Sequence, residues 1–100
     1  MKIFLNNNKH LHFVGIGGIG MSGMAELLHN HGFKISGSDL KKTNRTIHLN
    51  SYDNIKIYYG HNKNNIKNCD LIVYSSAINK NNPEIKAGEQ MNIPILKRAE

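Results

Sequence analysis

The sequence has one cysteine, no tryptophan and no long apolar run in its 100 residues. The lone Cys69 cannot form an internal disulfide, so a disulfide-stapled scaffold is excluded and a reducing cytoplasm is the expected location. No apolar run approaches the ~20 residues that a membrane-spanning helix needs, and the apolar stretch within residues 1–6 is too short for a secretory signal. These absences predict one small domain with no membrane partner.

Positive charge exceeds negative charge, with 13 Lys and Arg against 7 Asp and Glu and a formal net charge of +6. A nucleic-acid-binding protein concentrates such charge on one face and loses affinity steeply with salt. The lysines here are scattered and interleaved with asparagines, and they never form a block. We therefore interpret the excess as solvated surface and expect no nucleic-acid partner.

The most informative stretch is His12–Gly23, which has the pattern of a buried strand, a glycine turn and a helix. Gly15, Gly17 and Gly20 fit the G-x-G-x-x-G fingerprint of nucleotide-binding α/β folds. The first glycine permits a sharp turn, the second lets the backbone approach a diphosphate, and the third allows close helix–strand packing. Free amides at the start of the helix then attract phosphate. Gly20 and Gly23, three positions apart, are expected to lie against the sheet.

The rest of the chain alternates between strand and helix patterns. Strands are expected over 11–14, 33–38, 55–59, 71–74 and 93–96, and helices over 19–30, 43–49 and 83–91. In the first helix the expected apolar face is Ile19, Met24, Leu27 and Leu28. The second helix is the weakest prediction, because residues 41–57 are unusually polar.

This alternation predicts the α/β class, with a Rossmann-like doubly wound parallel sheet of about five strands in the order 3-2-1-4-5. Its ligand crevice should lie at the carboxyl ends of the strands, where the strand order reverses. We expect residues 1–10 to form a flexible arm and residues 11–100 to form the domain, which looks like one domain of a longer protein.

Polar residues follow the expected strands on this ligand side. Asp39 ends the second strand 19 positions after Gly20, where an acidic residue commonly accepts hydrogen bonds from a ribose, and Ser38 precedes it. The alternative for Asp39 is an ordinary turn aspartate. His61 follows the third strand, where an imidazole could contact a base or have no role at all.

The fourth strand runs into Ser75, Ser76, Ala77 and Ile78. In a doubly wound sheet this segment lies beside the glycine turn, so its small hydroxyl residues could donate to phosphate or ribose oxygens. The alternative is a turn with capping serines.

The other reactive side chains predict no chemistry. His29 and His31 could be half of a metal site, but no Cys or carboxylate cluster completes it. His12 is expected to be a hydrogen-bonded strand residue. Asp70 beside Cys69 opposes thiolate formation, so a nucleophilic role is not expected.

Taken together, these blocks closely resemble the Mur ligase family of peptidoglycan synthesis, and in particular its members that add L-alanine to UDP-N-acetylmuramate. The resemblance covers nearly the whole chain from Leu11 onward. It is carried by His12–Glu26, Ser36–Asp39, Gly60–His61, Ser75–Ile78, Asn82–Ile85, Ile93–Pro94 and Lys97–Glu100.

The resemblance implies a ligase of three domains, of which the first binds the UDP part of UDP-N-acetylmuramate and the others bind ATP with Mg²⁺ and the amino acid. It implies that the diphosphate lies on the glycine loop, that the uridine faces Ser38 and Asp39 with His61 near the base, and that Ser75–Ile78 line the opposite side. The loop residues concerned are Gly15, Gly17, Gly18, Ile19 and Gly20.

No G-x-x-x-x-G-K-[ST] phosphate loop occurs in this sequence, so no cofactor is expected to bind this chain. The central and C-terminal domains of the family are also missing from it. We therefore expect a substrate-binding module that does not catalyse ligation alone. The alternative is an NAD(P)-binding module of an oxidoreductase or of a redox-sensing regulator, because that class uses the same glycine turn.

Overall fold

The computed structural model describes residues 9–98. Five parallel strands form one sheet in the order β3-β2-β1-β4-β5, so the predicted order is confirmed. The strands are β1 (His10–Val14), β2 (Lys34–Asp39), β3 (Ile55–Tyr59), β4 (Leu71–Ser75) and β5 (Ile95–Arg98). Residues 1–8 of the expected N-terminal arm lie outside the described residues, and His10, its last residue, already begins β1.

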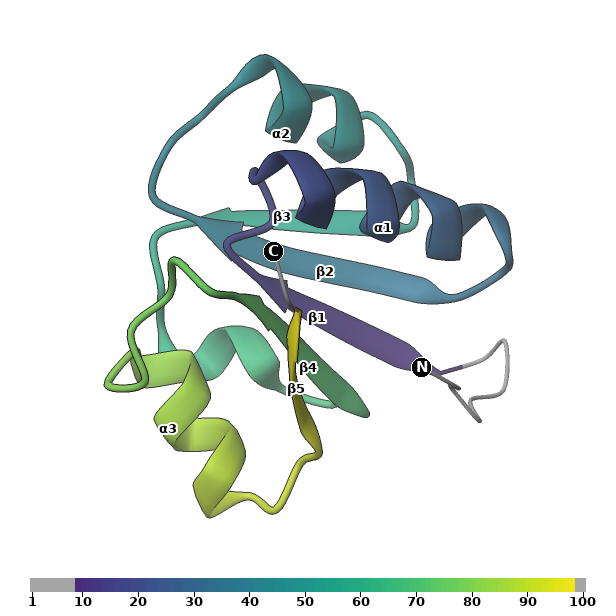
Figure 1. The fold of residues 1–100 in the computed structure, drawn as a ribbon. Helices are drawn as coiled ribbons and strands as arrows, with labels where there is room; N and C mark the ends of the chain where they lie inside the picture. Colours follow the sequence, from purple (N-terminus) through teal and green to yellow (C-terminus); the bar gives the residue numbers. More distant parts are fainter. Residues whose placement is uncertain (1–8, 99–100) are drawn as a thin grey trace.

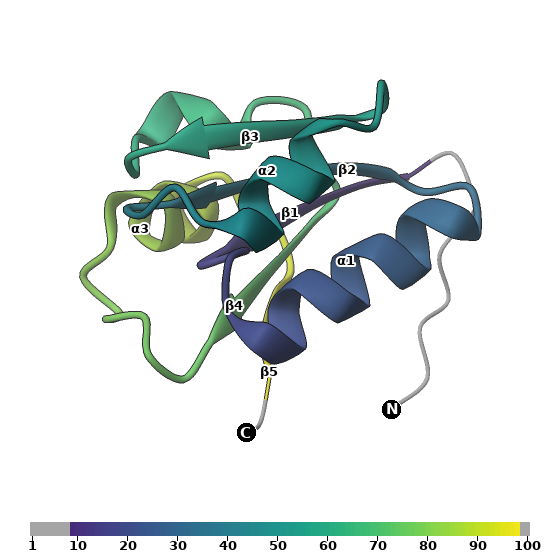
Figure 2. The ribbon, with the colours of Figure 1, turned by 90° about the horizontal axis from the view of Figure 1, so that it is seen from above.

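Helices cover both faces of the sheet (Figure 1). The helices α1 (Ile19–Asn30) and α2 (Asn44–Asn50) lie on one face, and the 3₁₀ helix η1 (Lys63–Ile66) and α3 (Pro83–Gln90) lie on the other. Each face has its own apolar core, the first around Leu11, Phe13 and Ile35 and the second around Val14 and Ile72. Figure 2, turned by 90°, shows the same separation of the helices.

Local signals explain where the helices begin and end. Thr43 caps α2 in a capping box with Thr46, so this polar segment does form a helix. Asn82 caps α3, whose first residue is Pro83, as the sequence predicted. After α1, Gly32 has a φ of +98°, a left-handed conformation that favours glycine, and the helix ends there as predicted.

Half of the predicted apolar face of α1 is confirmed, because Met24 and Leu28 are partly buried and pack against the core. The other half is wrong: Ile19 is 79% exposed and Leu27 is 56% exposed, whereas Met21 and Ala25 are fully buried. Met21 and Ala25 are one turn apart and so lie on the same face of the helix. Gly23 is also not against the sheet, because a Cβ there would meet no atom within 4 Å.

The last strand begins two residues later than predicted. Asn92 adopts a φ of +58°, and the Ile93 amide donates to the carbonyl of Gly88 at 2.9 Å. These residues therefore complete the end of α3, and pairing with β4 starts at Ile95. Among residues 9–98, no helix is both long and apolar enough to cross a bilayer.

Candidate functional site

The glycine turn joins β1 to α1 at the carboxyl edge of the sheet, between the ends of β2 and β4. Gly15 has a φ of +83°, which glycine adopts without strain. The amides of Gly15 and Ile16 both donate to the Ser38 carbonyl at the end of β2, at 2.8 and 3.0 Å. The turn thus lies at the point where the strand order reverses, as the fingerprint predicted.

The first turn of α1 has no side-chain cap within the described part of the chain. Its N-cap is Gly18, which is exposed, and the first backbone bond inside the helix runs from the Ser22 amide to the Gly18 carbonyl. The amides of Ile19, Gly20 and Met21 come before that bond and so have no acceptor inside the helix. With the positive end of the helix dipole, they form a place where an anion is favoured.

Asp39 is part of the glycine turn. Its carboxylate accepts from the Gly17 amide at 2.9 Å and from the Lys41 amide at 3.1 Å. A Cβ on Gly17 would lie 2.8 Å from Asp39 Oδ2 and 3.0 Å from Thr46 Cγ2. The missing side chain of Gly17 therefore makes room for Asp39 and Thr46.

Two guanidinium groups flank the turn, and the sequence analysis named neither as a site residue. Arg45 Nε donates to the Gly17 carbonyl at 2.8 Å from the first turn of α2. A Cβ on Gly20 would overlap the guanidinium of Arg98 at the end of β5. Arg45 belongs to the polar segment 41–57, in which no motif distinguishes one charged residue from its neighbours.

The segment after β4 forms a wall beside Gly15. Ser75 Oγ lies 3.3 Å and Ile78 Cδ1 lies 3.1 Å from the position that a Cβ on Gly15 would take. The Ile78 amide donates to the Ser75 carbonyl at 3.0 Å and closes the turn, while Ser76 and Ala77 are exposed. The structure therefore brings the glycine turn and Ser75–Ile78 together, as expected.

Ser38 and Asp39 are adjacent in sequence but do not share a surface. Successive side chains of a strand alternate between faces, so Asp39 reaches the α1 side and Ser38 reaches the α3 side. Ser38 is fully buried and bonds His61 Nδ1 at 2.8 Å. His61 is the more accessible member of this pair, with its side chain 12% exposed.

Glu84 is the largest omission of the sequence analysis. It is fully buried on α3, and its carboxylate takes bonds from His12 Nε2 at 2.7 Å and Ser38 Oγ at 2.7 Å. The Asn62 amide at 3.0 Å and Asn65 Nδ2 at 2.8 Å bond its second oxygen. A glutamate in the first turn of a helix is usually an exposed partner of the dipole, so the burial of Glu84 could not be predicted from its position.

The pKa of Glu84 reflects these partners. Burial alone raises the pKa of a carboxyl, but the hydrogen bond and charge of His12 and the bonds from Ser38 and Asn65 outweigh it. The pKa of Glu84 is therefore lowered, and the group is a carboxylate at neutral pH. His12 is the hydrogen-bonded strand residue that the sequence predicted.

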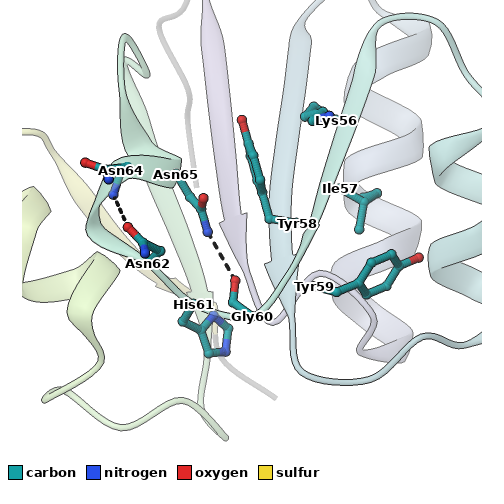
Figure 3. A pocket seen from close by; sticks show the side chains of 9 residues that line it. All are labelled: Lys56, Ile57, Tyr58, Tyr59, Gly60, His61, Asn62, Asn64 and Asn65. Carbon is teal, nitrogen blue, oxygen red and sulfur yellow. Dashed lines mark hydrogen bonds between the residues drawn. The ribbon is translucent and has the colours of Figure 1, made fainter.

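Two open pockets lie beside η1 and meet at His61. One, of about 540 Å³, runs along the outer edge of β3 and is lined by Tyr58, Tyr59, Asn65 and neighbouring residues (Figure 3). The other, of about 460 Å³, lies between η1 and α3. Among the predicted site residues, both pockets touch only His61. A third pocket, of about 130 Å³, lies between α1 and α2 and is lined by Ile19 and Arg45 among other residues.

The chain resembles known proteins along nearly its full length. The family model described as "Mur ligase family, catalytic domain" matches residues 10–100. UDP-N-acetylmuramate–L-alanine ligase of Rickettsia typhi is 58% identical over 90 residues, which are 90% of this chain and 18% of that protein.

Solved structures agree with the sequence matches. The UDP-N-acetylmuramate-alanine ligase of Thermotoga maritima matches with a TM-score of 0.84 and 37% identity, over 89% of this chain and 20% of that one. The enzyme WbmH of Bordetella bronchiseptica, solved with NAD⁺, matches less well, with a TM-score of 0.67 and 25% identity, over 86% of this chain and 37% of that one.

The matches cover nearly all of this chain but only a small part of each ligase. This chain spans about a fifth of the length of the two alanine ligases. The family match nevertheless covers residues 10–100 of this chain. That range includes the glycine turn, the wall after β4 and the buried Glu84. The chain belongs to the Mur ligase family.

Proposed function

We propose that this chain is the part of an ATP-dependent UDP-N-acetylmuramate–L-alanine ligase that binds the UDP portion of the sugar nucleotide. The observation that carries the proposal is the uncapped first turn of α1, which lies between the ends of β2 and β4. The identity of 58% to an alanine ligase supports this branch of the family.

In the proposed complex the diphosphate lies on the amides of Ile19 and Gly20. The guanidinium group of Arg45 lies at Gly17 and that of Arg98 lies at Gly20, where both complement the negative charge of the diphosphate. The exposed Gly18 places no side chain in the approach, and the wall from Ser75 to Ile78, packed against Gly15, closes one side.

The uridine is proposed to extend from the diphosphate toward the end of β2 and β3. Asp39 faces the ribose from the α1 side, and His61 faces the base from the α3 side, with Ser38 behind it. This placement uses both polar groups although the sheet separates their side chains.

The reaction itself is proposed for a longer ligase in the cytoplasm, which uses ATP and Mg²⁺ to join L-alanine to the lactyl carboxylate. In that ligase this chain has two proposed partners, the central domain, which binds ATP and Mg²⁺, and the C-terminal domain, which helps bind the amino acid. Among residues 9–98, no group of three His, Cys, Asp or Glu side chains is arranged to hold a metal ion. The chain alone is proposed to bind the sugar nucleotide without catalysing ligation.

Calorimetry tests the proposal directly. The chain is titrated with UDP-N-acetylmuramate and, separately, with NADH. We expect heat of binding with UDP-N-acetylmuramate only. Preferential binding of NADH would favour the dinucleotide-binding module instead, the alternative to which the likeness to an NAD⁺-bound enzyme points.

A further inference from the structure

A line of hydrogen bonds runs through the α3 side of the sheet and ends at the crevice. His12 Nε2 and Ser38 Oγ each lie 2.7 Å from Glu84 Oε1, and Ser38 Oγ lies 2.8 Å from His61 Nδ1. His12, Ser38 and Glu84 are fully buried, whereas His61 lies where β3 ends. Only the last member of the line can therefore meet a ligand.

The direction of each bond follows from Glu84. An ionised carboxylate accepts hydrogen bonds and cannot donate them. Ser38 has a single hydroxyl proton, and it must point at Glu84 Oε1. The same oxygen of Ser38 can then only accept from His61, so Nδ1 of His61 carries a proton.

A neutral imidazole with a proton on Nδ1 has a bare, accepting Nε2. Because Nδ1 points inward at Ser38, Nε2 lies on the far side of the ring, and no other described residue bonds it. In Figure 3 the ring lies at the end of the sheet, away from Lys56 and Tyr58 further back along β3. His61 Nε2 is therefore a hydrogen-bond acceptor that faces the crevice.

We propose that Glu84, acting through Ser38, holds His61 in the Nδ1–H tautomer, and that the accepting Nε2 selects uracil over cytosine. The N3 atom of uracil carries a hydrogen and can donate to Nε2. The N3 atom of cytosine is itself an acceptor and would face Nε2 with no proton between them. This inference rests on the proposed function, since it assumes that His61 meets the base.

Glu84→Gln reverses the line of bonds without changing its shape. The second oxygen of Glu84 faces two donors, the Asn62 amide and Asn65 Nδ2, so the amide oxygen of glutamine takes that place. Its NH₂ then faces both Ser38 Oγ and His12 Nε2 and donates to both, and His12 carries its proton on Nδ1 toward Ser36 Oγ. The freed hydroxyl proton of Ser38 turns to His61 Nδ1, and the ring proton moves to Nε2, which becomes a donor.

The test has two measurements on the chain, both at pH 8, where an ordinary imidazole is neutral. Proton–nitrogen NMR spectra of the His61 ring show which nitrogen carries the proton in the free chain. Calorimetric titrations with UDP and with CDP give the ratio of their affinities. Glu89→Gln, the same change at an exposed position of the same helix, is the matched control.

We expect a protonated Nδ1 and at least tenfold tighter binding of UDP than of CDP in the wild-type chain and in Glu89→Gln. In Glu84→Gln the proton moves to Nε2 and the ratio falls to threefold or less. Should Glu84→Gln fail to fold, Ser38→Ala removes the hydroxyl between Glu84 and His61 and leaves the bond between His12 and Glu84. His61 Nδ1 then has only Glu84 Oε2, 3.7 Å away, to hold its proton, so the ratio should fall but by less than in Glu84→Gln.

A wild-type ring protonated on Nε2 would overturn the proposal, and so would UDP binding no tighter than CDP. An unchanged ratio in folded Glu84→Gln would overturn the role of that residue. If neither nucleotide binds, the proposed function itself fails for this chain, and the ring spectrum still decides the tautomer. If Glu84 served only to stabilise the fold, Glu84→Gln would lower the stability of the chain but leave the ratio of UDP affinity to CDP affinity unchanged.

Discussion

The carboxylate of Asp39 accepts a hydrogen bond from the backbone amide of Gly17 at 2.9 Å. This contact ties the end of β2 to the glycine turn after β1. The second glycine of the fingerprint therefore accommodates the Asp39 carboxylate and Thr46, two residues before the amides on which the diphosphate is proposed to lie. A change at either residue therefore affects both the turn and the ligand.

Asp39→Asn should weaken the binding of UDP-N-acetylmuramate by less than about tenfold. The asparagine oxygen can still accept from the Gly17 amide, but that bond loses the charge that strengthens it. The NH₂ then faces the exposed Lys41 amide, which loses its acceptor, and the two changes cost roughly 1 kcal/mol. Calorimetry on the variant and the wild-type chain measures the change. Complete loss of binding would show that the carboxylate has a larger part than a ribose contact explains.

Gly17→Val should weaken the same binding by tenfold or more, equivalent to at least about 1.4 kcal/mol. Its branched side chain meets Asp39 Oδ2 and Thr46 Cγ2, at 2.8 and 3.0 Å from the Cβ position, and pushes them or the turn aside. Circular dichroism must first show that the variant is folded. Unchanged affinity in a folded variant would reject the proposed place of the diphosphate.

Gly23→Ala should stabilise the chain by roughly 0.5–1 kcal/mol, because alanine restricts the unfolded chain more than glycine does in a helix. Gly23 lies within α1, and a Cβ there meets no atom within 4 Å. Urea unfolding followed by circular dichroism measures the gain. A loss of stability would mean that the space beside Gly23 is needed by the fold.

The fold could be predicted from the sequence because its signals are local. The glycine turn, the cap at Asn82 and the alternation of strands and helices fix the order of the sheet. The exposure of Ile19 and Leu27 on α1 could not be predicted, since both are as apolar as the residues that are buried. Only the position of the sheet under the helix decides which side faces inward.

The candidate site also has parts that could be predicted from the sequence and parts that could not. Gly15 and the wall from Ser75 to Ile78 could be placed from strand ends, because parallel strands bring their ends to one edge. The bond between Glu84 and His12 could not, because it joins residues 72 positions apart across the sheet. The sequence around Glu84 is that of an ordinary first helical turn, and the sequence around His12 is that of an ordinary strand. Neither indicates that the two side chains form a buried pair.

Cys69 should react slowly with iodoacetamide at pH 8 in the folded chain and quickly in urea. Burial, with the charge of Asp70 as a smaller cause, raises the pKa of its thiol to about 11, so little thiolate is present. Mass spectrometry after timed labelling gives both rates. Equal rates in the two conditions would contradict the burial of the thiol.

Acid should destabilise the chain in two ranges of pH. Burial lowers the pKa of His10, so the unfolded chain takes up a proton first, and this contribution to stability is lost as the pH falls below the ordinary 6.5. The lowered pKa of Glu84 acts at a more acidic pH, because its contribution is present above the ordinary 4.5 and is lost as the pH falls toward the folded-state pKa. Urea unfolding between pH 3 and 8 measures both. Glu84→Gln should reduce the loss of stability in the second range, to which the lowered pKa of Glu26 also contributes, while Glu89→Gln leaves both ranges unchanged. A free energy of unfolding that stays constant between pH 5 and pH 3 in the wild-type chain would contradict the lowered pKa of Glu84.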